Sequence, residues 1–314
     1  MTTSWHAAAS ALLASLLLMA PAAVGLGFAV LRRERRRRRS RSPIDDTHRL
    51  RRPPGTWVRS KLYKLQEDLQ WDIFLLTMTS VSPVTIVLTT AVLEARTPGR
   101  AEVIVCALAI AGSICWYTRR IVRLGDAAAA CKLGLQCELA VAHELDALLR
   151  DGYGVYHDVP LDGTNLDHVV VGDDGVVVVE TKGRARPTSG DGPPPTTLRV
   201  RDGAVMTPGP SVPWADTGPI AQARSGAELL RAHLRDHASI DVAVEAMVVY
   251  PGWHVTGGDR GPVPVTSARR AAQVARARCT GTLGADRRRR VEAWLGEATT
   301  TLEPAHLVRL PEHA

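Results

Sequence analysis

Three chargeable residues, Asp167, Glu180 and Lys182, interrupt a stretch of sequence that is rich in valine. Two apolar runs of strand length, Leu166–Val171 and Val176–Thr181, are joined by a Gly-Asp-Asp-Gly sequence that is typical of a tight hairpin turn. Side chains alternate between the two faces of a strand, so Glu180 and Lys182 are expected on the same face. Charged groups in an apolar hairpin are costly unless they are paired or bind a ligand. The sequence therefore predicts a β-hairpin that carries a polar site.

Two carboxylates that lie close together raise each other's pKa unless a cation lies between them. Mg²⁺, or Mn²⁺ in its place, takes oxygen ligands. A metal held by Asp167 and Glu180 would activate a water and stabilise charge on a scissile phosphate. Lys182 would orient that water or neutralise the phosphorane, and Glu138, on a predicted preceding helix, would complete the metal shell. We therefore expect metal-dependent hydrolysis of phosphodiesters, with Asp167, Glu180 and Glu138 as the metal ligands.

Each of these residues also has a simpler interpretation. Asp167, Glu180 and Lys182 could form a structural ion pair on one face of the hairpin. Glu138, taken alone, is as consistent with an exposed helical carboxylate as with a metal ligand. His168 should point to the face opposite Asp167, and we interpret it as structural.

The elements that must position these side chains follow from periodicity and turn residues. Apolar residues recur every three or four positions in Ala127–Leu149, which predicts a helix that ends at Gly152. Further along, apolar runs and turn residues predict these elements: strand Tyr153–Val159, the hairpin above, a small hairpin of Leu198–Val200 and Ala204–Met206, helix Gly218–His237, strand Ile240–Tyr250, strand Pro262–Thr266, and helices Ala268–Ala277 and Arg287–Thr299. The α-β-β-β-α-β order predicts an α/β core built on a mixed sheet.

Charge is unevenly distributed along the 314 residues. Residues 1–125 contain 19 Lys and Arg against 8 Asp and Glu, a net charge of +11, whereas residues 126–314 contain 20 against 24, a net charge of −4. The basic composition is therefore no argument that the C-terminal part binds nucleic acid. We interpret Arg287–Arg290 as a solvated helix start. The five cysteines form no CxxC pair, which indicates small buried side chains in a reducing compartment.

The N-terminal part contains three apolar runs that we interpret as membrane spans: 7–31, 73–93 and 103–120. The basic loop 32–72 begins with the cluster Arg32–Arg39 and is expected to end in a short amphipathic helix near Trp57–Trp71. By the positive-inside rule, the N-terminus should lie outside and the domain after residue 125 in the cytoplasm. A cleaved signal peptide is the alternative for the first run, but the arginines follow that run instead of preceding it.

The motif residues also carry a resemblance to a known family. Asp167, preceded by a helical glutamate and followed by Glu180-x-Lys182 on the next strand, resembles the pattern of the PD-(D/E)xK nuclease superfamily. More narrowly, about residues 130–255 resemble the nuclease-related (NERD) domain through these segments: Gly134–Glu138, Tyr153–Tyr156, Asn165–His168, Val179–Gly183 and Gln222. Cys137 departs from the family pattern, which usually has glycine before the glutamate.

The resemblance implies a nuclease-like core in residues 126–255. The apolar runs predict a membrane region in 1–125 before it, and the last predicted strand and helices form a C-terminal α/β extension in 256–314. The resemblance implies catalytic roles for five residues: Glu138, Asp167, Glu180, Lys182 and Gln222. It also implies DNA as the partner and a role in DNA processing, here at the cytoplasmic face of the membrane. Because a fold does not guarantee an activity, a catalytically inactive binding or scaffold module at the membrane is the alternative.

Overall fold

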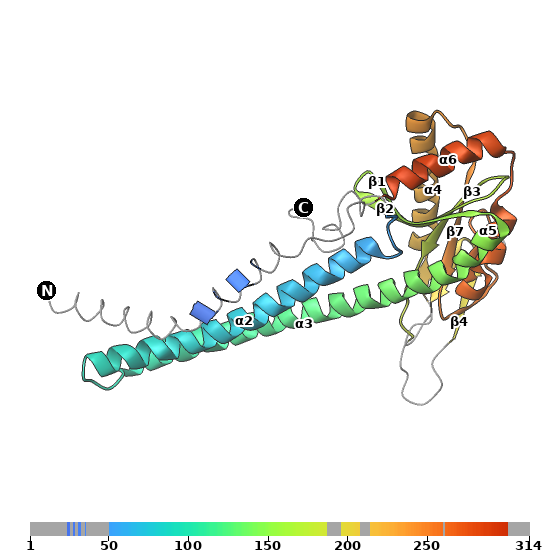
Figure 1. The fold of residues 1–314 in the computed structure, drawn as a ribbon. Coiled ribbons are helices and arrows are strands. Elements are labelled where there is room, and N and C mark those ends of the chain that lie inside the picture. Colours follow the sequence, from blue (N-terminus) through green and yellow to red (C-terminus); the bar gives the residue numbers. More distant parts are fainter. Residues whose placement is uncertain are drawn as a thin grey trace. The chain divides into compact units, whose positions relative to one another are not determined.

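A computed structural model describes residues 50–186, 196–207, 214–259 and 261–300, together with six isolated positions between 24 and 35 (Figure 1). Apart from those six positions, the first predicted span, 7–31, and the arginine cluster Arg32–Arg39 lie outside the described residues. So do residues 301–314 of the predicted C-terminal extension. The membrane span at 7–31 and the end of the C-terminal extension therefore stay predictions.

The chain divides into two compact units. Among the described residues, the first unit contains 65–127, and the second contains 50–64 and 128–300. Helix α2 (Thr56–Leu93) and helix α3 (Arg100–Leu145) each continue from one unit into the other.

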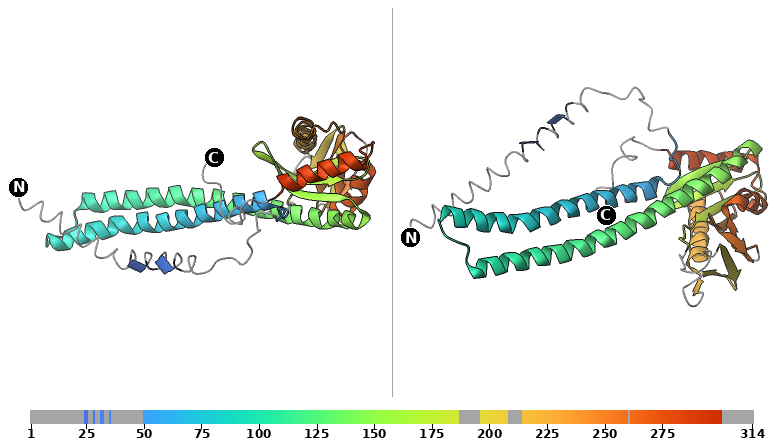
Figure 2. Two further views of the ribbon diagram at one scale, coloured as in Figure 1. Left: turned by 45° about the horizontal axis from the view of Figure 1, so that its top comes forward. Right: turned by 90° about the horizontal axis from the view of Figure 1, so that it is seen from below.

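The first unit is a helical hairpin in which α2 and α3 run side by side in opposite directions (Figure 2). Near one end of the hairpin, Arg120 Nε lies 2.6 Å from the buried carboxylate of Asp72. Both helices are long and apolar enough to cross a membrane, and their most apolar stretches are not buried inside the protein. The predicted spans 73–93 and 103–120 lie within them, which makes α2 and α3 candidate spans by length and composition.

The two long helices differ from the separate elements that the sequence predicts. The amphipathic helix near Trp57–Trp71 and the span 73–93 form one helix, and the span 103–120 continues into the first helix of the soluble unit. No proline lies between the joined parts of α3, and the lone Gly125 costs only about 1 kcal/mol in a helix interior. The chain leaves helical geometry after a short 3₁₀ segment, η2 (Asp146–Asp151), at Gly152.

The second unit is built on a five-stranded mixed sheet. The strands lie in the order β1 (Gly154–Leu161), β2 (Thr164–Val171), β3 (Val176–Thr181), β7 (Val244–Tyr250) and β9 (Val265–Ser267). The pairs β1/β2 and β2/β3 are antiparallel, whereas β3/β7 and β7/β9 are parallel. The predicted hairpin is confirmed as β2 and β3, and its turn is closed by the Gly172 N–H, which donates to the Gly175 carbonyl. The mixed α/β architecture is as expected.

A second, smaller sheet follows β3 in the chain. Its strands lie in the order β6 (Trp214–Asp216), β5 (Ala204–Thr207), β4 (Thr197–Arg201) and β8 (His254–Thr256). The small hairpin predicted around Asp202 and Gly203 is confirmed as β4 and β5. Both turn residues have positive φ, 52° and 73°, which is the backbone conformation that Asp-Gly favours in a two-residue turn.

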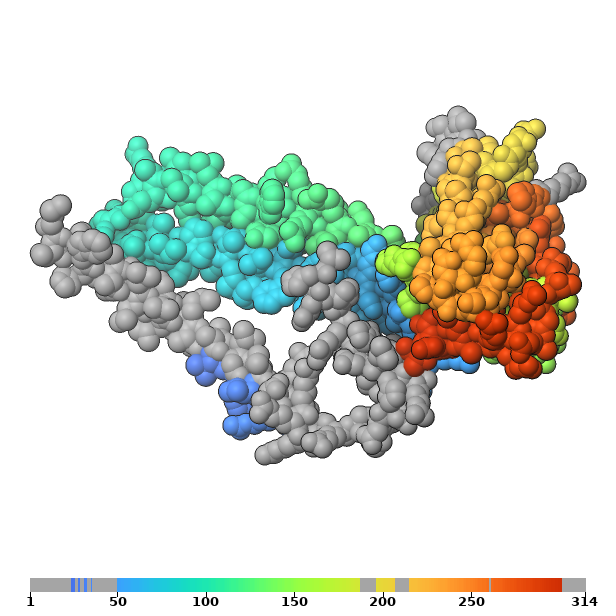
Figure 3. Space-filling view, turned by 90° about the horizontal axis from the view of Figure 1, so that it is seen from above, coloured from blue at the N-terminus to red at the C-terminus, as the bar shows by residue number. Residues whose placement is uncertain are grey.

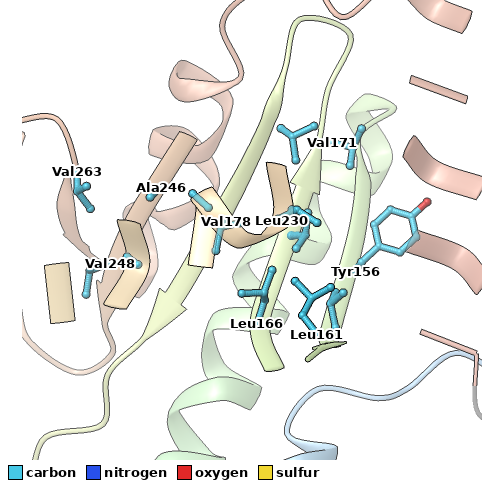
Figure 4. Packing of buried hydrophobic residues seen from close by; sticks show 14 of the residues in the cluster. Tyr156, Leu161, Leu166, Val171, Val178, Leu230, Ala246, Val248 and Val263 are labelled. Atoms are coloured by element: carbon cyan, nitrogen blue, oxygen red, sulfur yellow. The ribbon is translucent and has the colours of Figure 1, made fainter. Parts of the chain in front are cut away.

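Helices cover both faces of the five-stranded sheet. Helix α4 (Gly218–Ala238) and helix α6 (Ala285–Ala298) lie next to each other on one surface of the unit (Figure 3). Under them, side chains from β1, β2, β3 and β7 pack with Leu230 of α4 (Figure 4). The opposite face packs against the end of α3, η2 and α5 (Ala271–Arg278), which follows the 3₁₀ turn η3 (Ala268–Arg270).

Candidate functional site

Asp167 lies where strands β2 and β3 stop pairing. Their antiparallel ladder runs from Val171 opposite Val176 to His168 opposite Val179 and ends there. One residue further along β2, Asp167 Oδ2 accepts a hydrogen bond from the Thr181 N–H at 2.7 Å. The end of the ladder therefore brings this carboxylate beside the last residues of β3.

Glu180 and Lys182 lie on the same face at the end of β3, as the strand periodicity predicts. The Lys182 N–H donates to the Val249 carbonyl, so the backbone continues along β7 beyond the last strand residue. Lys182 Nζ lies 2.7 Å from Glu180 Oε1 and donates a hydrogen bond to Gln222 Oε1 at 2.7 Å. Gln222 comes from the first turns of α4, so an element 40 residues away completes this group.

Glu138 reaches the site from helix α3. Its side chain is 5% exposed, so the alternative of an exposed helical carboxylate is wrong. Glycines allow the close approach: a Cβ added to Gly183 would lie 3.3 Å from both Cys137 Sγ and Gly134 Cα. Cys137, the departure from the family pattern, thus packs directly against the glycine that follows the motif lysine. It leaves Glu138 buried toward the sheet.

The pKa of each of the three carboxyl groups is raised, mainly by burial. Burial is the main cause of the raised pKa of Glu138, about 8, and Asp158 and Glu180 add to it while Lys182 opposes it. Burial, then Glu180 and Glu138, raises the pKa of Asp167 well above its usual range. Burial also raises the pKa of Glu180, against the effect of Lys182. One ammonium therefore faces three carboxyl groups, and a simple structural ion pair accounts for only one of them.

Asp158 also lies in this region and is not among the residues that the sequence predicts for the site. It is fully buried on β1, and its backbone has a positive φ of 51°. Its charge raises the pKa of Glu138. Its carboxylate accepts the backbone N–H of Trp57 at 2.9 Å and lies 2.8 Å from Arg52 Nη2. A Cβ at Gly55 would lie 3.5 Å from Glu138 Oε2, so residues 52–57 also border the site. In the sequence, the only indication of the role of Asp158 was that an aspartate stands within a predicted apolar strand.

The site has the chemistry of a divalent-cation site. Glu138 Oε2 is buried and has no hydrogen-bond partner among the described residues, and such an orphaned acceptor calls for a donor or a cation. A cation would also relieve the mutual repulsion of the three carboxyl groups, and carboxylate oxygens are the ligands of Mg²⁺. However, within the described part of the chain no three His, Cys, Asp or Glu side chains converge as ready metal ligands. Two of the oxygens are instead held by Lys182 and by the Thr181 N–H.

His168 and the arginines at the start of α6 lie outside the candidate site. His168 is fully buried, and its Nδ1 lies 2.9 Å from His157 Nδ1. In the basic segment at the start of α6, Arg288 contacts Asp173 and Glu292, and Arg290 donates to the Ala238 carbonyl. These arginines therefore make contacts within the protein.

A comparison with known families gives one match: residues 133–251 match the model of the NERD family, the nuclease-related domain. All five candidate residues and Asp158 lie within this range. No curated protein and no solved structure matches the chain significantly.

Proposed function

We propose that this chain, whose residues 133–251 form a nuclease-related domain, is a membrane-anchored, Mg²⁺- or Mn²⁺-dependent nuclease that hydrolyses DNA phosphodiesters. The observation that carries the proposal is that the carboxyl groups of Glu138, Asp167 and Glu180 lie close enough to interact electrostatically, beside the Lys182 ammonium at the end of β3. Such a set is expensive to bury without a cation, and phosphodiester hydrolysis is the chemistry that a carboxylate-bound cation and a lysine serve.

Each side chain then has a definite role. Glu138, Asp167 and Glu180 would hold the cation, which supplies a water of lowered pKa and charge stabilisation at the phosphate. The Lys182 ammonium would donate hydrogen bonds to the attacking water or to the non-bridging phosphate oxygens. Gln222, whose amide oxygen accepts from Lys182, would be a positioning residue for that ammonium. Water adds to phosphorus, the bond to one ester oxygen breaks, and that oxygen takes a proton to leave as a hydroxyl.

The test is cleavage by the full-length protein in detergent, with linear, nicked and single-stranded DNA and with Mg²⁺ or Mn²⁺. The full chain is needed because residues 50–64 belong to the same unit as the site. Asp167→Asn and Glu180→Gln should abolish cleavage, whereas the exposed controls Asp202→Asn and Glu228→Gln should not. Absence of cleavage on every substrate, or cleavage that survives both site variants, refutes the proposal.

For the membrane arrangement, we propose that α2 and α3 each cross the membrane, so that the chain leaves the cytoplasm and returns to it and the second unit is cytoplasmic. An additional span in residues 7–31 places the N-terminus outside. The support is the length and composition of the two helices together with the arginines beside them. A C-terminal alkaline-phosphatase fusion should be inactive, and a fluorescent-protein fusion at the same position should be bright. An active phosphatase would refute the cytoplasmic placement and favour a secreted protein.

A second candidate function is a nuclease-fold module that binds at the membrane without cleaving. The observation in its favour is the net charge of −4 over residues 126–314, a poor electrostatic match to a phosphate backbone. Binding of Mn²⁺ by the wild type that is lost in Glu180→Gln would argue against it. Absence of Mn²⁺ binding in both proteins would favour it over the nuclease.

A further inference from the structure

A pocket of about 290 Å³ opens beside the candidate site, between the chain that leaves β3 and the first turn of α4. The side chains that line it include Lys182, Arg184, Asp216, Gln222 and Tyr250. Lys182 and Gln222 also belong to the candidate site, so the pocket and the site share a wall.

Tyr250 is the most buried aromatic residue that lines this pocket. Its side chain is 1% exposed, and its hydroxyl is buried with no hydrogen-bond partner among the described residues. Tyr250 lines the pocket together with Arg184 and Asp216. Burial, and then the charge of Asp216, raises the pKa of its hydroxyl, and Arg184 opposes this effect. A buried hydroxyl without a partner is unfavourable, so a polar ligand that accepts a hydrogen bond from it is bound more tightly.

Most polar groups around the pocket are donors. Lys182 and Arg184 contribute N–H groups, and Gln222 presents its amide nitrogen because its oxygen already accepts from Lys182. The one carboxylate, Asp216, lies 3.6 Å from Arg184 Nη1 and accepts the Gly218 N–H at 3.1 Å. The positive end of the 21-residue helix α4 adds to the same side. Because donors predominate and the Asp216 carboxylate already has partners, the pocket favours a ligand with several acceptor oxygens.

We propose that this pocket holds a phosphate group of a nucleic-acid strand, next to the phosphate at the candidate cleavage site, with Tyr250 and Arg184 as its contacts. The inference rests on the proposed function for the identity of the strand, since the pocket by itself selects only an oxyanion. A phosphate offers several acceptor oxygens, which match the Tyr250 hydroxyl, the Arg184 guanidinium and the Gln222 amide. The pocket would thereby fix the register of the strand relative to Lys182.

The test measures binding without cleavage. Full-length protein in detergent and EDTA is titrated against a fluorescent octanucleotide with a 5′-phosphate, the same octanucleotide with a 5′-hydroxyl, and inorganic phosphate as the competitor. Tyr250→Phe should weaken octanucleotide binding about tenfold, the loss of one hydrogen bond to a charged group. It should not lower the unfolding midpoint, because the deleted hydroxyl has no hydrogen-bond partner among the residues that the structure describes. Arg184→Gln should weaken binding at least as much.

Tyr156→Phe is the matched control. Tyr156 is also buried, but its hydroxyl donates to the Glu292 carbonyl at 3.1 Å, so this variant should lose stability and keep binding. A preference for the 5′-phosphate assigns a terminal phosphate to the pocket, and equal binding of both strands assigns an internal one. Wild-type binding by Tyr250→Phe, or failure of inorganic phosphate to compete, overturns the proposal. Binding that depends on Tyr250 without any cleavage in Mg²⁺ or Mn²⁺ refutes the nuclease and leaves the pocket standing.

Discussion

The ion pair between Arg52 and Asp158 ties the start of α2 to the sheet that carries the candidate site. Asp158 is fully buried, whereas the Arg52 side chain is 23% exposed. Replacing Arg52 with Met removes the cation and leaves the carboxylate inside the protein. The Trp57 N–H and the Asn165 amide still donate to it, at 2.9 and 3.2 Å.

The magnitude follows from this asymmetry. Removing one partner of a buried pair costs about 3–5 kcal/mol. Because two donors still bind the carboxylate, Arg52→Met should lower the free energy of unfolding by about 3 kcal/mol, the low end of this range. Asp158→Asn keeps an oxygen for the Trp57 N–H and leaves Arg52 able to reach water, so it should cost about 1 kcal/mol. The double variant should cost little more than Asp158→Asn alone. The coupling energy between the two sites is then about 2–3 kcal/mol.

The assay is urea unfolding of the full-length protein in detergent, followed by pulse proteolysis of the second unit. Arg289→Met is the matched control, because Arg289 pairs with Asp286 at 3.1 Å but both side chains are more than 70% exposed. It should change the free energy of unfolding by less than about 0.5 kcal/mol. A cost below about 1 kcal/mol for Arg52→Met, or additive effects in the double variant, would show that residues 50–57 are not held by this pair.

Three further predictions concern the site itself. In EDTA, the pKa of Glu138 is about 8 in the folded protein against 4.5 unfolded, so the folded state keeps a proton that the unfolded state loses and stability falls as pH rises between these values. For this group the free energy of unfolding should fall by about 1.4 kcal/mol per pH unit. Urea unfolding at pH 5, 7 and 8 should show this dependence in the wild type and its loss in Glu138→Gln. Gly183→Ala should cost about 1–3 kcal/mol and lower metal affinity, because its Cβ would press on Cys137; calorimetric Mn²⁺ titration checks this. Gln222→Ala should leave the unfolding midpoint unchanged, since the side chain is exposed, but lower kcat by releasing Lys182; an unchanged kcat contradicts the positioning role.

Local patterns predicted much of the architecture. The hairpin β2–β3, its turn, the small hairpin around Asp202 and the shared face of Glu180 and Lys182 all follow from alternation and turn residues within a few positions. The continuity of α2 and α3 was missed, because an apolar span and an amphipathic helix look like separate elements when only their composition is compared. No helix-breaking residue separates the two parts in α3, so the helical hydrogen bonds of the backbone continue from one part into the other.

The sequence by itself determined which residue types stand at the end of β3 and that they resemble a nuclease motif. Only the tertiary structure decided that Glu138 is buried near them, that Gln222 reaches Lys182, and that Tyr250 lines a pocket beside them. The same holds for Asp158, which receives the N–H of Trp57 from 101 residues away. Contacts of that separation leave no periodic trace in the sequence, because they depend on how the helices pack on the sheet, and that packing sets the burial and charge on which the proposed chemistry depends.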